Sequence, residues 1–201
     1  MDAGRPVIVA ETRLAGAYTI DLEPIADERG FFARQWCEQE LADAGLTTAV
    51  SQASVAYNHL PGTLRGMHWQ VAPHAEVKLV RCVRGAVHDV IVDLRPESST
   101  FAEWIAVELT EDNRRTLYVP EGFAHGYLTL ADGSEVWYQM SAPYAPDAAR
   151  GFRYDDARFG IAWPAAGELV VSDRDLAWPP FTEAALAPLV PVTGGLTAAD
   201  G

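Results

Sequence analysis

Two histidines and one lysine lie in short segments whose residue types could form a catalytic or metal-binding site. His68 lies within GMHWQ at 66–70, and His125 ends PEGFAH at 120–125. An imidazole titrates near neutral pH, so it can take or release a proton. The lysine, Lys78, can carry a positive charge that stabilises an oxyanion. Together these residues suit proton transfer, whereas the histidines alone would also suit a metal ion.

The two histidine segments resemble the sequence motifs of the cupin superfamily, in which histidines and a glutamate usually bind a metal. Proline, glycine and His125 match the second motif. In the first motif, Gln70 stands where a second histidine would fall, and Lys78 stands where the glutamate would fall. A lysine ammonium has no lone pair and repels a cation. We therefore expect no metal and no other cofactor, with a metal-dependent cupin enzyme as the alternative.

A closer resemblance, to the dTDP-4-dehydrorhamnose 3,5-epimerase family, runs from about residue 18 to residue 181. It rests on six segments in the family's order and with near-family spacing. They are DERGFF (27–32), LRGMHWQ (64–70), KLVR (78–81), DVIVDLR (89–95), the loop 122–126 and DRDLAWPP (173–180). The resemblance implies epimerisation at C3, at C5 or at both, of a nucleoside-diphosphate 4-keto-6-deoxyhexose in deoxysugar biosynthesis.

This chemistry needs a base, a group that stabilises the enolate oxygen, and an acid on the opposite face of the sugar. The resemblance assigns the base to His68 and places Asp175 against its far ring nitrogen, which would fix the tautomer. It assigns the enolate's positive partner to Lys78. Tyr138 matches the family's acid, and we expect a nearby cation to lower the pKa of this phenol, which is normally about 10.

Six further positions are implied to bind substrate: Arg29, Gln52, Arg65, His125, Tyr144 and Arg174. Arg29 and Arg65 would hold the diphosphate, because guanidinium groups match phosphate oxygens. Tyr144 matches a residue that stacks on the nucleotide base, and His125 matches one that lines the sugar site. The remaining histidines are interpreted as structural or surface residues.

Several positions depart from the family's pattern. Arg34 replaces an acid, Gln139 replaces a lysine, and an expected acid near Ala149 is absent. Residues 52–54 are QAS where the family has QDN. The base, acid and lysine are kept, so we expect proton transfer with an altered ligand-facing rim. Because these altered positions would face the ligand, the sequence leaves open which sugar is used and whether one or two carbons are inverted. A keto-isomerase and a non-catalytic sugar-nucleotide-binding protein are further alternatives.

The site residues need a scaffold, and the sequence predicts one made of short strands. Runs rich in β-branched and aromatic residues lie between turn signals at 17–24, 78–83, 86–94, 104–109, 115–119, 126–130 and 135–140. One helix is predicted over 38–44, ended by Gly45. This pattern predicts an all-β fold, a cupin-type jelly roll with few short helices. We expect one domain over 1–181 and a loosely ordered tail over 182–201.

Composition narrows the function classes further. The 201 residues carry a net charge of −13, which argues against a nucleic-acid partner. No apolar run approaches the roughly 20 residues of a membrane span, and the N-terminus lacks the features of a signal peptide. Two cysteines, Cys37 and Cys82, favour a reducing, cytoplasmic location over a disulfide scaffold. The family resemblance implies a homodimer whose N-terminal segment crosses to the partner.

Overall fold

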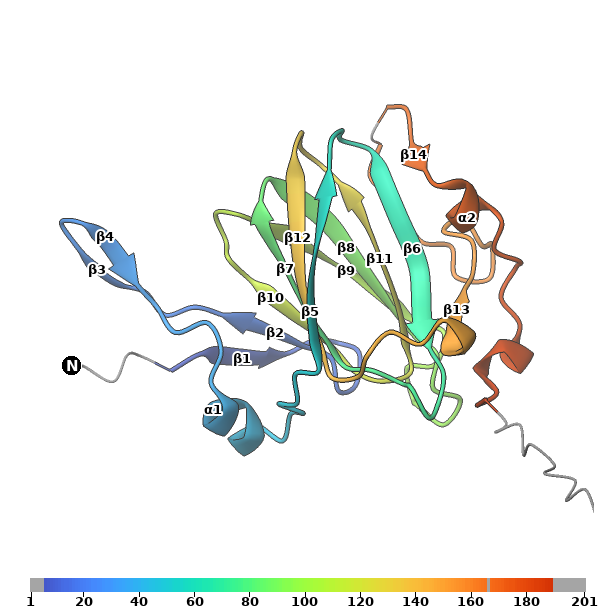
Figure 1. The fold of residues 1–201 in the computed structure, drawn as a ribbon, viewed down its shortest axis with the longest axis horizontal. Coiled ribbons are helices and arrows are strands. Elements are labelled where there is room, and N and C mark those ends of the chain that lie inside the picture. Colours follow the sequence, from blue (N-terminus) through green and yellow to red (C-terminus); the bar gives the residue numbers. More distant parts are fainter. Residues whose placement is uncertain (1–5, 166, 190–201) are drawn as a thin grey trace, which may run out of the picture.

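The protein is built from two antiparallel β-sheets that face each other (Figure 1). The computed structural model describes residues 6–165 and 167–189. This arrangement, with a few short helices, confirms the predicted all-β, cupin-type jelly roll. Within these ranges, no helix has the length and apolar character needed to span a membrane.

The first sheet has six strands in the order β1-β2-β10-β7-β12-β5. Their bounds are Ile8–Glu11 (β1), Tyr18–Asp21 (β2), Thr116–Val119 (β10), Lys78–Arg84 (β7), Ser134–Met140 (β12) and Gln52–Asn58 (β5). All of these neighbours are antiparallel. The register pairs Lys78 with Val119 on one side and with Met140 on the other, so this lysine begins its strand at one end of the sheet.

The second sheet follows the order β13-β6-β11-β8-β9, and β14 pairs with β6 in parallel. The bounds are Ala149–Gly151 (β13), Thr63–Gln70 (β6), Phe123–Thr129 (β11), Ala86–Asp93 (β8), Trp104–Thr110 (β9) and Val170–Val171 (β14). The pairing of β6 with β11 sets His68 directly opposite His125. Two strands that are distant in sequence thus bring the two histidines together.

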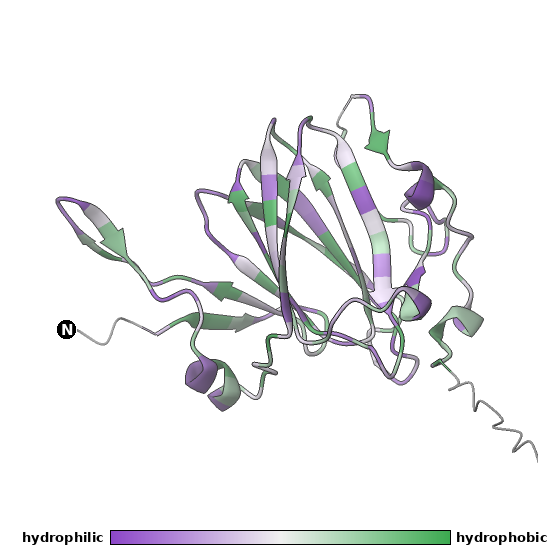
Figure 2. Cartoon of the chain, viewed as in Figure 1, coloured by the Kyte–Doolittle hydropathy of each residue, from purple (hydrophilic) through white to green (hydrophobic). Residues whose placement is uncertain are grey.

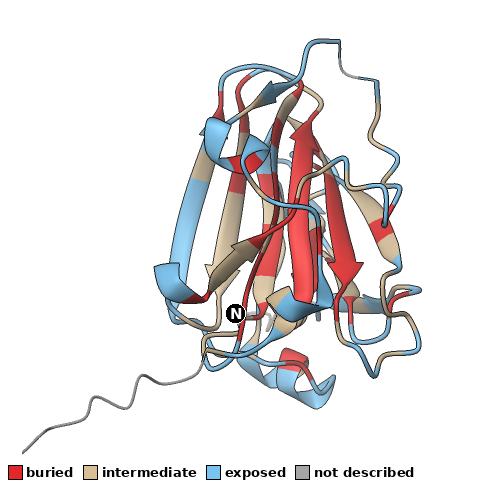
Figure 3. Ribbon diagram, turned by 90° about the vertical axis from the view of Figure 1, so that its right-hand side faces the viewer, coloured by how far each residue is buried: buried red, intermediate tan, exposed pale blue. Residues whose placement is uncertain are grey.

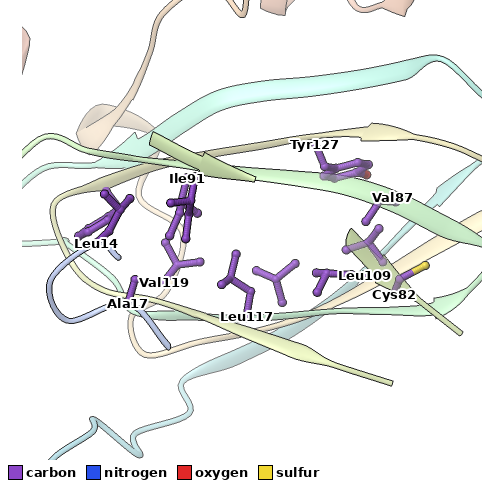
Figure 4. Packing of buried hydrophobic residues seen from close by; sticks show 13 residues of the cluster. Leu14, Ala17, Cys82, Val87, Ile91, Leu109, Leu117, Val119 and Tyr127 are labelled. Atoms are coloured by element: carbon purple, nitrogen blue, oxygen red, sulfur yellow. The ribbon is translucent and has the colours of Figure 1, made fainter. Parts of the chain in front are cut away.

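The main core fills the space between the sheets (Figure 4). Alternate residues of a strand point to opposite faces, and β8 shows this clearly. Val87 and Ile91 point into the main core, whereas Val90 and Val92 join a second cluster on the outer face of the sheet. A strand that is buried on both faces in this way lies in the middle of the molecule, as the red strands in Figure 3 show.

Helices and loops cover parts of both outer faces. The helix α1 (Glu38–Asp43) packs Leu41 against the first sheet. The segment after β13 covers the second sheet with an aromatic group of Phe152, Phe159 and Phe181 beside Trp69. This C-terminal part contains α2 (Asp173–Leu176) and the 3-10 turn η2 (Glu183–Leu186), and a further turn, η1 (Pro146–Ala148), precedes β13.

A small hairpin stands apart from the sandwich. Its strands are β3 (Ile25–Asp27) and β4 (Gly30–Phe32), which pair only with each other. In Figure 1 it projects away from both sheets. Phe31 and Phe32 are 46% and 65% exposed, so the hairpin presents apolar rings to its surroundings.

The predicted strands all correspond to observed strands, with differences of a few residues at their ends, and the helix ends at Asp43, close to Gly45. The sequence analysis did not name β1, β3, β4, β5, β6, β13 or β14. The strand β6 was missed because Arg65, Gly66 and His68 interrupt its apolar pattern, as the hydrophilic bands along this strand in Figure 2 show.

The structure describes only the first part of the tail that was predicted over 182–201. In its described part, Ala185, Leu186 and Leu189 pack against the outer core cluster. The backbone amide of Leu189 also donates to the carbonyl of Ala72 at 2.8 Å. Residues 190–201, the rest of this predicted tail, lie outside the described residues, so the proposed domain boundary at 181 stays a prediction.

Candidate active site

One cavity lies between the two sheets, on the side formed by β5, β12 and β6. Its volume is about 560 Å³, within the usual range of small-molecule sites. Its walls come from β5, β6, β7, β11, β12 and β13, from the connection between β12 and β13, and from α2 with its flanking residues. Eight of the ten predicted site residues line it: Arg65, His68, Lys78, His125, Tyr138, Tyr144, Arg174 and Asp175.

His68 and Asp175 form a hydrogen-bonded pair on the cavity wall. His68 Nε2 lies 2.6 Å from Asp175 Oδ1. The His68 side chain is 40% exposed, whereas that of Asp175 is only 7% exposed. When Nε2 is bonded to the carboxylate, a neutral imidazole keeps its lone pair on Nδ1. That nitrogen is therefore the one available to take a proton.

Asp175 reaches His68 because the short helix α2 docks beside β6. The Oγ of Ser172, just before this helix, accepts a hydrogen bond from the Asp175 amide at 3.1 Å. The Gly66 amide donates to Asp175 Oδ2 at 3.5 Å. Burial raises the pKa of Asp175, but the bonds and charge supplied by His68, with help from Gly66 and Ser172, hold the pKa below its usual value. The carboxyl group is therefore ionised at neutral pH.

Two glycines let β6 and β11 approach each other closely. A Cβ on Gly66 would lie 2.6 Å from the Cα of Gly126, and the φ of Gly66 is +135°. A larger residue at either place would push the strands apart or strain the backbone. The register of the ladder shifts between His125 and Tyr127, and this close contact is part of what holds His125 beside His68.

His125 forms a second histidine–carboxylate pair. His125 Nε2 lies 3.0 and 2.9 Å from the two carboxylate oxygens of Asp89. Asp89 projects from β8 on the same face as Val87 and Ile91, toward the space between the sheets. The two side chains are only 6% and 0% exposed. The sequence analysis named His125 but missed Asp89, although the alternation along β8 places it on the inward face.

Lys78 lies at the start of β7 with its ammonium group facing a carboxylate. Its Nζ is 3.1 Å from Glu76 Oε1, and the two side chains are 15% and 9% exposed. An ammonium has three hydrogen-bond donors, so this contact leaves others for an oxygen in the cavity. The sequence analysis missed Glu76, which stands two residues before the lysine.

Tyr138 lies on β12, in the sheet that faces β6. Its ring meets that of His125 edge to face, with the centroids 6.1 Å apart. Burial raises the pKa of Tyr138 well above its usual value, Tyr127 and Asp89 raise it further, and only Arg65 opposes them. The expected net lowering of the pKa is therefore wrong, because the lowering effect of Arg65 is smaller than the combined effects that raise it. At neutral pH the phenol keeps its proton, so it can donate one.

The mouth of the cavity carries arginines and one exposed tyrosine. Arg174 Nη2 donates to the hydroxyl of Tyr144 at 3.0 Å, and the Tyr144 amide donates to Gln52 Oε1 at 2.9 Å. Arg65 Nε donates to Asn58 Oδ1 at 2.9 Å. Gln52 does not itself line the cavity, but it holds Tyr144, which does. The result is a positively charged entrance on an acidic protein.

Arg29 is the predicted site residue that the structure places away from the cavity. It lies in the turn of the β3–β4 hairpin, where its Nε donates to Asp27 at 3.2 Å. Its side chain is 83% exposed. Because the hairpin projects from the sandwich (Figure 1), the expectation that Arg29 holds the diphosphate is not met within a single chain.

Seven further residues line the cavity without having been predicted as site residues, and Arg150 and Trp178 are two of them. Arg150 follows Ala149 on β13, and its Nη1 donates to the carbonyls of Asp147 and Ala149 at 2.7 and 3.0 Å. Trp178 packs flat against Gly151, where a Cβ would lie 2.4 Å from the indole ring. Both residues belong to parts of the chain with too little regular structure to give a periodic signal.

The two histidine–carboxylate pairs do not combine into a metal-binding group. Among the residues that the structure describes, no three or more His, Cys, Asp and Glu side chains cluster closely enough to hold an ion. Lys78 occupies the position at which the cupin motif carries a glutamate. The donor set at this site therefore suits proton transfer better than metal binding.

Comparison with known proteins decides the family. A family model described as dTDP-4-dehydrorhamnose 3,5-epimerase matches residues 11–183. The chain belongs to the dTDP-4-dehydrorhamnose 3,5-epimerase family. This confirms the resemblance that the six sequence segments indicated, and it places the protein among the isomerases.

Relatives in this epimerase family are similar along most of the chain. The dTDP-4-dehydrorhamnose 3,5-epimerase of Mycolicibacterium smegmatis is 41% identical over 182 residues, which is 90% of this chain and 89% of that protein. The epimerase structure from Bacillus anthracis with TDP and PPi bound gives a TM-score of 0.84 at 37% identity, covering 88% of this chain and 100% of that one. A 3'-monoepimerase from Streptomyces bikiniensis in complex with dTDP-quinovose gives 0.79 at 32% identity, covering 88% and 91%.

Proposed function

We propose that this epimerase inverts a carbon next to the ketone of a nucleoside-diphosphate 4-keto-6-deoxyhexose, at C3, at C5 or at both. The observation that carries the proposal is the placement of His68, Lys78 and Tyr138 on the walls of one cavity. The names of the relatives support dTDP-4-keto-6-deoxyglucose as the first substrate to test.

The reaction begins at a carbon beside the ketone. Nδ1 of His68 takes the proton, the C–H electron pair forms a C=C bond, and the ketone oxygen becomes an enolate oxygen. The ionised carboxylate of Asp175 stabilises the imidazolium that results. The ammonium of Lys78 donates to the enolate oxygen. The carbon that has lost its proton is now planar.

Inversion requires a proton to return on the opposite face of the sugar. Tyr138, on the sheet that faces His68, is the acid. As its hydroxyl gives up the proton, the enolate electrons return to the carbon and the ketone is restored. The phenolate then regains a proton from solvent and the imidazolium of His68 releases one, which returns both groups to their starting state.

The entrance of the cavity suits the nucleotide part of the substrate. Arg65 and Arg174 supply guanidinium groups for the diphosphate oxygens. The Tyr144 ring, which is 51% exposed, supplies an aromatic face for the base. Its hydrogen bonds with Arg174 and Gln52 hold this ring at the cavity mouth before any ligand binds.

Deuterium exchange tests the proposed reaction. With dTDP-4-keto-6-deoxyglucose in D₂O, we expect NMR to show solvent deuterium at C3 and C5. Exchange at C3 alone would indicate a single-position epimerase, an outcome consistent with the similarity to the 3'-monoepimerase. The proposal is wrong if a panel of 4-keto-6-deoxyhexoses on different nucleotides shows no exchange at either carbon.

We further infer a homodimer in which the hairpin of one protomer completes the site of its partner. On β5, Val55 and Tyr57 alternate with the inward residue Ala56, and both are exposed, at 56% and 46%. On the same outer face, Arg81 has a buried Nε with no hydrogen-bond partner among the described residues. A second copy over this face would cover the apolar residues and bring an Arg29 to the cavity from outside.

A mixed-subunit experiment tests the homodimer. Light scattering should give the mass of two chains, and Arg29→Ala should weaken binding of dTDP. At a substrate concentration too low to saturate Arg29→Ala, a mixture of Arg29→Ala and Lys78→Met protomers should be more active than either variant alone, because a hybrid dimer keeps one site with both residues intact. A monomer in solution, or no regain of activity on mixing, would contradict shared sites.

We also infer a cytoplasmic protein, on the support of two free thiols, Cys37 and Cys82. Neither cysteine has a partner thiol in the described residues. Cell fractionation tests this inference, and recovery of the native protein from an extracytoplasmic fraction would contradict it.

A further inference from the structure

A buried carboxylate lies beside the lysine of the proposed reaction and has no part in the mechanism described so far. Glu76 Oε1 is 3.1 Å from Lys78 Nζ, and the Glu76 side chain is 9% exposed. Val77, between them, points into the cluster under α1, whereas Val80 further along points into the main core. Glu76 and Lys78 therefore project to the same face, toward the space between the sheets.

The carboxylate of Glu76 is itself held in place by a buried amide. Gln70, which is 5% exposed, donates from Nε2 to Glu76 Oε2 at 3.1 Å. The orientation of this amide is fixed, because its Oε1 accepts from the Ala145 backbone amide at 2.6 Å while Nε2 also meets the carbonyl of His74 at 3.0 Å. One carboxylate oxygen is thus occupied by Gln70, and the other is directed at the lysine.

A lysine ammonium needs this kind of support to act as a fixed charge. It is a compact cation on a flexible four-carbon stem, and burying it without a partner is costly. Glu76 supplies the opposite charge and takes one of its three donors. Gln70 joins this pair to the segment that carries Tyr144, because Ala145 follows that tyrosine directly. The lysine and the nucleotide-binding mouth are therefore braced by one set of hydrogen bonds.

We propose that Glu76 is a positioning residue that holds the Lys78 ammonium at the place where the enolate oxygen forms. This inference rests on the proposed epimerase function. It predicts that Glu76 acts on the chemical step through Lys78 and has little effect on nucleotide binding, because Gln70 keeps its bonds to Ala145 and His74 when Glu76 is changed.

The alternative role is purely structural, with Glu76 only neutralising a buried charge so that the chain folds. Kinetics separate the two roles. A positioning residue changes kcat of the folded protein, because misplacing a catalytic group by about 1 Å can cost on the order of 100-fold. A structural residue changes the melting temperature and the folded fraction, and it leaves kcat per folded molecule unchanged.

The first experiment measures kcat, KM and thermal stability with the sugar nucleotide on which the wild type exchanges deuterium. Glu76→Gln should lower kcat by about 10- to 100-fold and leave KM within about threefold. Glu76→Asp keeps the charge and should retain a higher kcat than Glu76→Gln. Glu103→Gln is the matched control, because it removes the carboxylate of an ion pair with Arg13 outside the cavity; its kcat should equal that of the wild type.

The second experiment is a double-mutant cycle, which stays informative if Glu76→Gln folds poorly. Lys78→Met should remove most of the activity, and adding Glu76→Gln to it should change the remaining exchange rate by less than about twofold. If the losses of activity from the two substitutions multiply in the double variant, Glu76 does not act through Lys78. A wild-type kcat in Glu76→Gln would likewise overturn the positioning role. A wild type that exchanges no deuterium with any 4-keto sugar would instead refute the proposed function, and this inference with it.

Discussion

The cavity contains two histidine–carboxylate pairs that are chemically alike but differ in their surroundings. In the pair of His68 with Asp175, the imidazole is 40% exposed and the carboxylate comes from a separate segment, 107 residues later. In the pair of His125 with Asp89, both side chains are almost fully buried and the carboxylate comes from the neighbouring strand. The two pairs therefore differ in exposure, with the imidazole of the proposed base open to the cavity and that of His125 almost fully enclosed.

The same difference extends to the proposed acid. The Tyr138 ring contacts that of His125 and packs, partly buried, against the main core. A phenol is protonated at neutral pH and burial raises the pKa of Tyr138 further, whereas the open pair offers an unprotonated nitrogen beside an ionised carboxylate. The open side of the cavity thus suits proton removal, whereas on the closed side a strongly basic enolate carbon has to draw the proton from Tyr138, because a raised pKa makes the phenol a weaker acid. Four substitutions test this division, and they follow in order of their expected effect on turnover.

His68→Ala should have the largest effect on turnover. We expect kcat to fall by about 1,000-fold, because a general base is removed. The free energy of unfolding should fall by about 1 to 2 kcal/mol, less than in His125→Ala, since the buried carboxylate of Asp175 loses its imidazole partner but keeps the Gly66 amide. Initial rates by NMR and urea unfolding measure the two quantities. Full activity in this variant would refute the assignment of the base.

Asp175→Asn should lower kcat by about 100-fold, because the amide no longer stabilises the imidazolium of His68. It should also change the acid stability. The folded pKa of Asp175 lies below its unfolded value, so its carboxylate stabilises the fold above pH of about 3.8, and this contribution is lost as the pH falls through the folded pKa. Unfolding curves at decreasing pH should show this loss in the wild type and lack it in the variant. Identical curves would contradict the pairing.

Tyr138→Phe should lower the rate of inversion by about 10-fold or more, because the acid on the closed side is missing. Proton removal by His68 should continue. In D₂O, the variant should therefore incorporate deuterium into substrate of unchanged configuration faster than it forms inverted product. The ratio of the two deuterated species, read by NMR, measures this effect. An unchanged rate of inversion would remove Tyr138 from the mechanism.

His125→Ala should have the smallest effect on kcat of the folded protein, within about 10-fold, and the largest effect on stability. Its loss leaves the buried carboxylate of Asp89 without a partner, which costs about 3 kcal/mol. Urea unfolding beside the His68→Ala variant provides the comparison. If His125→Ala unfolded like the wild type but lost as much activity as His68→Ala, the distinction between the two pairs would fail.

The strands could be predicted where burial alone determines the residue types along them. The strand β8 is recognisable because its residues are apolar on both faces. The strand β6 carries the chemistry and was missed, because Gly66 and the polar side chains of Arg65 and His68 remove the alternation on which such predictions depend. The strand β5 was missed for a similar reason, since its outward residues are exposed and its inward residues include Asn58.

The site could be predicted where a family motif marks a residue, and could not be predicted where only folding creates the contact. His68, Lys78 and Tyr138 lie in recognisable segments, and they do line one cavity. Their surroundings set their properties, and the burial that raises the pKa of Tyr138 has no signature in sequence. Arg29 shows the opposite case, because a clear motif does not reveal that the hairpin projects from its own chain.

Because α2 follows both sheets in the chain, the site can be completed only after the sheets have been synthesised. As a ribosome extends the chain, both sheets and the arginine of β6 can be complete while Asp175 is still unmade. A chain that stops or is clipped before Ser172 would keep Arg65 and Lys78 but lack the partner that orients His68. Such a fragment would also lack Arg174 and Trp178, so the final segment supplies both the partner that orients His68 and part of the cavity wall.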